Sequence, residues 1–242
     1  MALAINTPIA LIGYFSPQKA LTPAGVLHAW VLGVVVWAGL GWRGYLVVSA
    51  YFLLGTAVTK LGLKAKQAKG IAEKRGGSRG PENVWGSALT GAVCALGNVL
   101  LPDPLWWLAY AASFAAKLAD TTSSEIGKAY GKTTFLITTW EQVPAGTEGA
   151  VSREGSLAGM AAAAGLTVLA VGVGGTWLGT LSPPLWIAIC WISAMLATTA
   201  ESWIGVVWQP HVPWLTNELV NGIQTTLAAG LAVGLAGLVL WV

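Results

Sequence analysis

The chain has 242 residues, of which 55% are hydrophobic and only 10% are charged. A water-soluble domain normally carries about 25% charged residues, so this composition excludes an ordinary soluble protein. The net charge is +3, and we expect contact with membrane lipid and no nucleic-acid partner. Several of the 14 tryptophans stand at the edges of apolar runs, a pattern typical of the aromatic belt at a membrane surface.

Apolar segments approach the ~20 residues that a membrane-spanning helix needs. They run over 24–41, 44–62, 84–101, 105–123, 156–181, 184–204 and 218–241. Prolines at 102–104 and 182–184 predict two tight helical hairpins. Residues 1–23 hold a short first segment that is membrane-inserted or interfacial. We therefore predict an all-α polytopic bundle of about seven transmembrane helices, with residues 1–242 as a single domain.

Positive charge is concentrated in residues 60–79, and residues 124–154 add three more basic side chains. The positive-inside rule places both segments on the cytoplasmic side of the membrane. Alternating the predicted spans from there puts the two proline hairpins outside and residues 205–217 inside. We therefore predict that 63–83 and 124–154 are cytoplasmic loops that carry the functional residues.

The two predicted hairpins show a weak internal sequence repeat. Glycine-rich runs open the segments at 86–91 and 155–159, and Thr-rich runs with an acid close them at 120–127 and 198–205. Small-residue membrane helices resemble one another by chance, but the shared order favours duplication of a helical-hairpin unit.

The run Lys74–Asn83 combines basic residues with glycines directly before a predicted helix. Glycines let backbone amides turn toward an anion, and arginines make charge-assisted contacts to phosphate. The alternative is a basic loop attracted to anionic lipid, and we interpret the lysines at 60–69 in that way. The run from Arg75 onward is better explained as a polyphosphate cradle at a helix start.

The end of the fourth span carries charged residues at membrane depth. Lys117, Asp120, Ser124 and Lys128 are spaced 3, 4 and 4 residues apart, so they share one helical face. Buried charge is costly and usually faces a cavity or a partner. Asp120 and Glu125 offer the hard oxygen ligands that Mg²⁺ prefers. A Lys117–Asp120 pair that only neutralises itself is the alternative.

Residues 127–133 look like a nucleotide-binding P-loop but do not form one. Only three residues separate the glycines, where the motif needs four, and the run follows a membrane helix rather than a strand. Lys128 and Lys132 remain candidates for phosphate contact. His28 and His211 lie far apart, with no partner at metal-ligand spacing, so we expect no zinc site.

Two further polar groups follow. Thr147, Glu148 and Arg153 precede or open the fifth span, and Glu201 closes the sixth. Asn217, Asn221, Gln224 and Thr225 form a polar stripe on the last span. Such stripes can simply hold helices together. Four acids gathered with five basic residues at one face instead suggest a metal–polyphosphate site.

Together these segments resemble the integral-membrane phytyl-phosphate kinase family of cyanobacteria and plastids, which is distantly similar to CTP-dependent phytol and dolichol kinases. The match lies in Arg75–Ser87, Ala119–Lys128 and Pro144–Ser152, with Asn217–Gly222 also similar. It extends from about Leu21 onward. The resemblance implies transfer of a phosphoryl group from CTP, or another nucleoside triphosphate, to phytyl monophosphate, with Mg²⁺ as cofactor.

The resemblance and the charge pattern together assign roles to the residues. We expect Asp120, Lys128 and Arg75 to be catalytic, and Asp120, Glu125, Glu148 and Glu201 to hold the metal. Substrate and nucleotide contacts are expected from Arg75, Gly76, Gly77, Ser78, Arg79, Glu82, Asn83, Ser87, Thr121, Ser124, Lys128, Lys132, Thr147, Glu148, Arg153, Asn217 and Asn221. A transporter and a CTP-dependent cytidylyltransferase of a lipid phosphate remain the alternatives.

Overall fold

A computed structural model describes residues 1–16 and 19–240 of the chain, and within them the fold is all-α, as predicted. The helices are α1 (Ala2–Phe15), α2 (Pro23–Lys60), α3 (Leu63–Ala68), α4 (Pro81–Leu100), α5 (Pro104–Tyr130), α6 (Arg153–Gly174), α7 (Pro183–Val207) and α8 (Asn217–Leu240). Short 3-10 turns lie at η1 (Lys74–Gly77), η2 (Gly175–Leu178) and η3 (Gln209–His211). A small antiparallel ribbon joins β1 (Phe135–Leu136) to β2 (Ala150–Val151).

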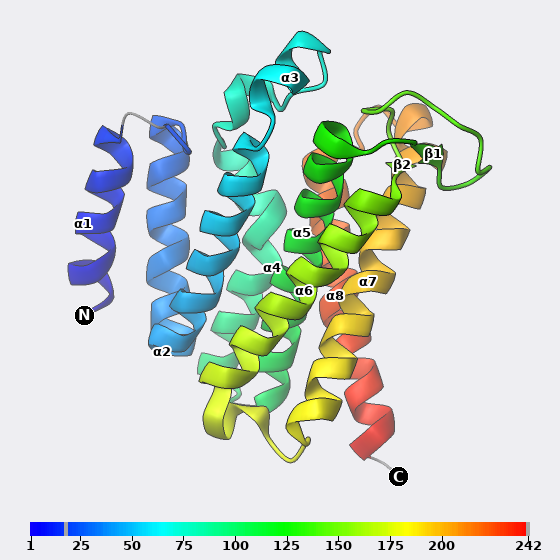
Figure 1. The fold of residues 1–242 in the computed structure, drawn as a ribbon. Coiled ribbons are helices and arrows are strands. Elements are labelled where there is room, and N and C mark those ends of the chain that lie inside the picture. The colour runs from blue at the N-terminus through cyan, green and yellow to red at the C-terminus, as the bar shows by residue number, and fades with distance from the viewer. Residues whose placement is uncertain (17–18, 241–242) are drawn as a thin grey trace.

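Helix α2 is a hairpin of two helical halves, which correspond to the predicted spans 24–41 and 44–62. Gly41 breaks the helix with φ 62° and ψ −156°, a backbone conformation open mainly to glycine. The chain then folds back, so that the rings of Trp37 and Tyr45 meet at a centroid distance of 5.5 Å. Figure 1 shows the two halves side by side.

Proline and a capping side chain start several helices. Thr22 accepts a hydrogen bond of 3.0 Å from the Gly25 amide before α2, and Asp103 accepts one of 2.7 Å from the Leu105 amide before α5. Each cap is followed by proline at the first helical position, where its fixed φ suits the helix and no amide donor is lost. The Ser152 side chain caps α6 and accepts a hydrogen bond of 3.1 Å from the Gly155 amide.

Helix α5 is the centre of the bundle, and α2, α4, α6, α7 and α8 all pack against it. Its middle, from Trp107 to Asp120, is buried on every side. Alanines at 109, 111, 112, 115, 116 and 119 let the neighbouring backbones approach closely.

Helix α5 also runs past the predicted end at residue 123 and stops at Tyr130. The predicted loop 124–154 therefore begins only at Gly131, because the charged residues between 124 and 130 find partners within the fold and need no solvated loop. The predicted loop 63–83 likewise contains α3, η1 and the first residues of α4.

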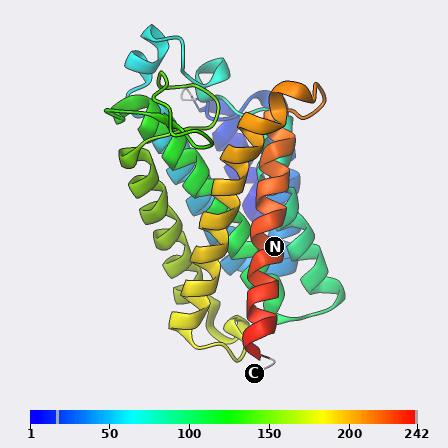
Figure 2. The ribbon, with the colours of Figure 1, turned by 90° about the vertical axis from the view of Figure 1, so that its right-hand side faces the viewer.

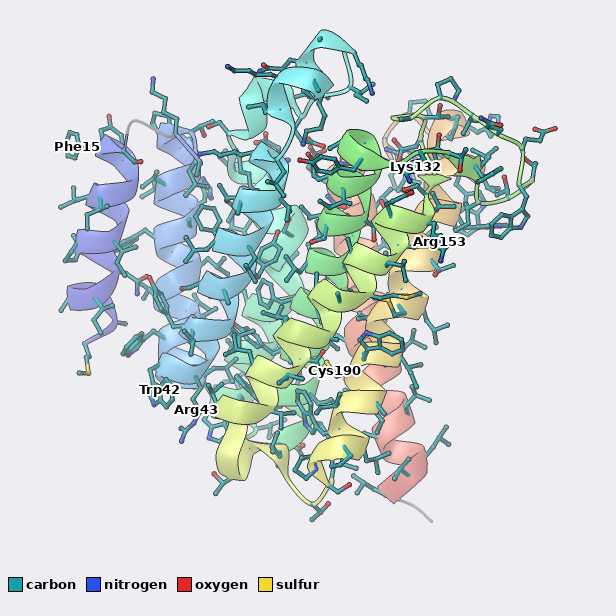
Figure 3. All side chains as sticks on the ribbon, in the orientation of Figure 1. Phe15, Trp42, Arg43, Lys132, Arg153 and Cys190 are labelled. Carbon is teal, nitrogen blue, oxygen red and sulfur yellow. The ribbon has the colours of Figure 1, made fainter. Side chains whose placement is uncertain are left out.

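All long polar segments lie at one end of the bundle. Figures 1 and 2 show α3, the β1–β2 region and the α7–α8 connection at the same end, from two directions. The two proline hairpins lie at the opposite end. In the described part of the chain, Arg43 alone among the Lys and Arg residues lies at that opposite end, beside Trp42 (Figure 3), and its Nε donates to the Val173 carbonyl at 2.8 Å.

Four helical segments are long and apolar enough to cross a membrane: Pro23–Lys60, Arg153–Leu178, Pro183–His211 and Asn217–Leu240. Helix α1 is apolar but has only 14 residues. The multi-pass character is therefore clear, whereas a count of about seven spans stays a prediction. It depends on α4, on α5 with its buried charges, and on counting α2 twice.

Replacement of Gly39 by alanine should destabilise the bundle. A methyl group at Gly39 would lie 3.0 Å from the Cα of Ala95 on α4 and closer still to its carbonyl, so the two helices must separate. We expect a loss of about 1–3 kcal/mol, measured as a lower midpoint of thermal unfolding in detergent. Gly230→Ala is the control, because a methyl group there meets nothing within 4 Å. Equal midpoints for the two variants would contradict this packing.

Candidate active site

A polar cavity of about 850 Å³ opens at the end of the bundle that carries the polar segments. Helices α2, α4, α5, α7 and α8 line it, together with η1 and part of the loop 134–150. Within the described residues its charged lining consists of five basic side chains, Lys74, Arg75, Arg79, Lys117 and Lys128, and seven acids, Glu73, Glu82, Asp120, Glu125, Glu148, Glu201 and Glu218. Segments far apart in the sequence thus contribute to one site.

The η1 turn presents Arg75 to the start of α4. Arg75, Gly76 and Gly77 all have positive φ, at 53°, 62° and 84°, so the backbone turns sharply there. The Arg75 guanidinium forms an ion pair with Glu82 and donates to the Asn83 Oδ1 at 2.9 Å. The same Oδ1 accepts from the Gly80 amide at 3.1 Å. The predicted cradle before α4 is therefore an ordered turn that is fastened to the first turn of the helix.

Arg79 is held without a carboxylate partner among the described residues. Its Nη1 donates to the Tyr51 hydroxyl at 3.2 Å, and its guanidinium carbon lies 5.5 Å from the Tyr51 ring centroid and 5.7 Å from that of Phe52. Its backbone pairs with the segment before α2: its amide donates to Ala20 O, and its carbonyl accepts from the Thr22 amide, both at 3.0 Å. A guanidinium has five donors, so Arg79 can bind an anion.

Lys117, Asp120 and Asn221 form a buried group between α5 and α8. Lys117 pairs with Asp120 one turn later on the same helix, and its Nζ donates to the Asn221 Oδ1 at 2.8 Å. The Lys117 side chain is only 8% exposed. The shared helical face predicted from the spacing is thus present, and the last helix supplies the third member.

Glu125 lies deeper than the sequence indicates. It forms an ion pair with Lys66, whose side chain is 1% exposed and whose Nζ also donates to Thr59 O at 2.8 Å. Lys128 lies 3.8 Å from the Glu125 Oε1 and 3.2 Å from the Glu73 Oε1. Our interpretation of the lysines at 60–69 as a lipid-attracted basic loop is therefore wrong for Lys66, which is buried and neutralises an acid that we predicted to bind metal.

Asp120, Glu148 and Glu201 bring three carboxyl groups to the cavity from α5, the 134–150 loop and α7. Glu148 packs on α7, where its Oε1 lies 3.0 Å from the place that a Cβ on Gly205 would take. Partial desolvation by the surrounding protein raises the pKa of Glu148, and the negative charge of Asp120 raises it further.

Nowhere in residues 1–16 and 19–240 do three His, Cys, Asp or Glu side chains stand close enough to hold a metal ion alone. The donors nevertheless fit Mg²⁺, because this ion is usually held by one or two carboxylates together with substrate phosphates and water. The carboxylates that line the cavity are donors of that kind.

Most of the predicted site residues line this cavity, but three do not. Lys132 and Arg153 are exposed and lie outside the cavity lining (Figure 3), and Gly76 is also outside it. Arg153 begins α6 next to Ser152, and it is Ser152 that is buried against Gly127 and Gly131. At the start of α6, Ser152 therefore faces the protein interior, and Arg153 is exposed outside the cavity lining.

The structure adds residues to the site that the sequence analysis did not assign to it. Tyr51, Glu73 and Lys117 line the cavity, and Lys66 lies behind Glu125. Glu73 could have been found, since it is the only acid in the basic segment 60–79. No local signal distinguishes Lys66 from Lys64, which is exposed on the same short helix.

Residues 6–229 match the family described as integral membrane protein DUF92. The chain belongs to this family. The matched region extends from α1 into α8 and includes every residue that lines the polar cavity. The polar cavity therefore lies entirely within the part of the chain that matches the family.

Three relatives show how far the similarity extends. An uncharacterised membrane protein of Synechocystis sp. is 57% identical over 238 residues, covering 97% of this chain and 90% of its own. VTE6, a chloroplastic protein of Arabidopsis thaliana, is 41% identical over 96% of this chain and 70% of its own. An uncharacterised membrane protein of Methanocaldococcus jannaschii is 30% identical over 89% and 86%. No solved structure matches. The predicted resemblance is confirmed at the level of the family.

Replacement of Lys66 by methionine should leave the buried Glu125 carboxylate with only the Lys128 ammonium, 3.8 Å away, as a cationic neighbour. Loss of one member of a buried pair costs about 3–5 kcal/mol, so we expect a clearly lower unfolding midpoint. The double variant Lys66→Met, Glu125→Leu should recover most of this loss, because no unpaired charge remains. Lys64→Met, at an exposed site of the same helix, is the control. A Lys66→Met variant as stable as this control would show that the pair is absent.

Proposed function

We propose that this DUF92 protein is a membrane lipid-phosphate kinase. It transfers a phosphoryl group from CTP, or another nucleoside triphosphate, to phytyl or another prenyl monophosphate and forms the diphosphate. The observation that carries the proposal is one polar cavity, rich in both cations and carboxylates, at one end of an apolar helical bundle. The cyanobacterial and chloroplastic relatives agree with the resemblance to phytyl-phosphate kinases of cyanobacteria and plastids.

The charge of the cavity supports a role for Mg²⁺. Five basic and seven acidic side chains line it among the described residues, so with all of them ionised the lining has a net charge of −2. A nucleotide polyphosphate would be repelled unless a cation accompanied it. Glu148 and Glu201 would hold Mg²⁺ together with Asp120, which also pairs with Lys117, whereas Glu125 lies between Lys66 and Lys128. The bound ion would neutralise charge that develops on the phosphates.

The protein's own residues would bind and align the two phosphate groups. Arg75 and Arg79 reach the cavity before α4, and Lys128 reaches it from α5. This set suits a reaction in which two polyanions must be brought together in line.

No general base is needed for the chemical step. A phosphate monoester has its second pKa near 6, so its attacking oxygen is largely ionised at neutral pH. That oxygen forms a bond to the terminal phosphorus of the triphosphate. The bond from this phosphorus to the bridging oxygen breaks, and the nucleoside diphosphate leaves with the electron pair. The absence of histidine from the cavity lining, as far as the structure describes it, is compatible with this chemistry.

We also propose that the cavity opens to the cytoplasm and that α4, α5 and both halves of α2 cross the membrane. The concentration of Lys and Arg at the cavity end supports this orientation. The duplicated unit would then be the pair of hairpins α4–α5 and α6–α7. Asp120 and Glu201 stand at corresponding ends of the two hairpins and both line the cavity.

The geometry of the cavity supports the two alternative functions, a transporter and a cytidylyltransferase, less well than a kinase. A transporter would be expected to place its substrate site near the middle of the bilayer, whereas this cavity lies at one end of the bundle. A cytidylyltransferase would use the same charges, but it would release pyrophosphate and attach the nucleotide to the lipid. The products therefore distinguish it from a kinase.

Purified protein should convert phytyl monophosphate, CTP and Mg²⁺ into phytyl diphosphate and CDP. Asp120→Asn should lose at least about a hundredfold in turnover. The asparagine oxygen can still accept from Lys117, but the buried ammonium loses its counter-charge, so the unfolding midpoint of the variant is measured beside its turnover and only folded protein is assayed. Product formation is followed by chromatography and mass spectrometry, with and without a chelator. Glu141→Gln is the matched control, since Glu141 is exposed and lies outside the cavity.

The outcomes separate the alternatives. Release of pyrophosphate with a nucleotide-linked lipid would replace the kinase by a cytidylyltransferase. Full turnover by Asp120→Asn would remove Asp120 from the site. No turnover by the wild type with any combination of nucleoside triphosphate and prenyl phosphate would contradict the proposed function.

Single cysteines should reveal the orientation. Lys69→Cys lies at the cavity end and Thr180→Cys at the opposite end, and both positions are exposed. The native Cys94 and Cys190 are buried and should react slowly. A membrane-impermeant maleimide added to right-side-out vesicles should label Thr180→Cys and spare Lys69→Cys. The reverse pattern would place the cavity on the outside.

A further inference from the structure

A second cavity, of about 360 Å³, lies between α1, both halves of α2 and the start of α4. Apart from its rim, its lining is mostly apolar, with residues such as Ile9 and Gly13 of α1, Val48 and Phe52 of α2 and Val84 of α4, and with Asn6 and Ser49 as polar exceptions. We call it the α1–α2–α4 groove. Water is a poor occupant of such a surface, because the walls offer few hydrogen-bond partners.

The groove and the polar cavity share one rim. Tyr51, Arg79, Asn83 and Ser87 line both of them. At this rim Arg79 is fixed by Tyr51 and Phe52 and has no carboxylate partner in the described residues. A cation without a counter-ion thus stands where an apolar space passes into a polar one.

A ligand that fits both sides of this rim must be amphiphilic and anionic at one end. A free nucleotide fits only the polar side, and a neutral hydrocarbon gives the Arg79 guanidinium no anionic partner. A monophosphate on a long hydrocarbon chain satisfies the guanidinium and the apolar walls together.

We propose that the α1–α2–α4 groove holds the isoprenoid tail of the substrate, with its monophosphate bound by Arg79 at the shared rim. This inference rests on the proposed function and adds a tail site, a headgroup contact and a role for α1. The nucleotide then occupies the rest of the polar cavity, on the side of Asp120 and Lys128. The tail enters from the lipid beside α1, and the phosphate meets the nucleotide without leaving the membrane surface.

Helix α1 forms one wall of the groove and is fastened to the first half of α2. The Trp30 Nε1 donates to the Thr7 Oγ1 at 3.2 Å. The buried Asn6 lies against Gly33, where a side chain on α2 would collide with it. A helix of 14 residues held in this way forms one side wall of the groove.

Gly13 offers a clean test, because it lines the groove and a Cβ added there meets nothing within 4 Å. Gly13→Trp should fill the groove without disturbing the packing of α1. We expect the KM for phytyl monophosphate to rise roughly tenfold or more, in the range that a badly fitting apolar pocket produces. The KM for the nucleotide, and for a five-carbon prenyl monophosphate that ends near the rim, should change less than about twofold.

Gly165→Trp is the matched control. Gly165 lies in α6, which contributes no residue to the groove lining, and a Cβ there also meets nothing within 4 Å. It should leave the kinetics of both substrates unchanged. Equal kinetics of the Gly13 and Gly165 variants with phytyl monophosphate would overturn the proposal. So would an equal loss for the five-carbon and the phytyl substrate in Gly13→Trp.

A binding experiment keeps the tail site separate from catalysis. Phytyl monophosphate with a diazirine at the far end of its tail is photolysed on the wild-type protein, and labelled peptides are identified by mass spectrometry. Labels should fall on α1, α2 and α4 at groove positions such as Ile9 and Val48, and Arg79→Gln should weaken labelling at a fixed probe concentration. Labels mainly on α6, α7 or α8 would overturn the proposal.

The two proposals can fail separately. Groove labelling that inorganic phosphate and phytol leave unchanged but excess phytyl monophosphate removes, in a protein without kinase turnover, would retain the tail site and reject the kinase. Kinase turnover with labels outside the groove would retain the kinase and reject the tail site. Labelling that membrane phospholipid removes equally well would mark the groove as a lipid-binding site and overturn the assignment to the substrate.

Discussion

Lys117 and Glu125 stand two turns apart on α5, and both lie inside an otherwise apolar bundle. Each has a partner on α5 and another from elsewhere in the chain. Lys117 pairs with Asp120 and also donates to Asn221 of α8, and Glu125 lies near Lys128 and pairs with Lys66 of α3. An unpaired charge in this environment would be strongly destabilising. The pairing therefore fixes α3 and α8 against the end of α5, and the polar cavity opens at that end, lined by α2, α4, α5, α7 and α8.

The need to pair buried charges also determines the chemistry of the cavity. Carboxylates outnumber basic residues in its lining, and several acids are already engaged by lysine or arginine. The remaining charged side chains can bind a polyphosphate that carries a cation, because the cation neutralises part of the phosphate charge. The site thus combines internal pairs, which stabilise the fold, with Glu148 and Glu201 in the cavity lining, and Asp120 belongs to both groups because it pairs with Lys117 and also lines the cavity.

Arg79 links the polar and apolar parts of the molecule. Its backbone holds the segment before α2 next to η1, and its side chain rests on Tyr51 and Phe52 of α2. A membrane enzyme that acts on a lipid phosphate must hold an anion and a hydrocarbon at once. The shared rim around Arg79 provides both contacts over a short distance, with α1 as the outer wall of the apolar side.

The sequence by itself determined the all-α class, the apolar segments, the breaks at the two proline hairpins and the gathering of polar segments at one end. These features depend on local composition and on helical spacing, which a chain carries wherever it folds. The face shared by Lys117 and Asp120 follows from the same spacing, and motif resemblance placed the chain in its family.

Only the tertiary structure decided which charges meet. Lys66 and Lys64 lie two residues apart on one short helix, yet one is buried against Glu125 and the other is exposed. Lys132 and Arg153 lie outside the cavity, whereas Tyr51 and Glu73 line it. The groove beside α1 likewise depends on how three helices cross. Pairing and cavity formation depend on distances between residues far apart in the chain, and no local pattern encodes those distances.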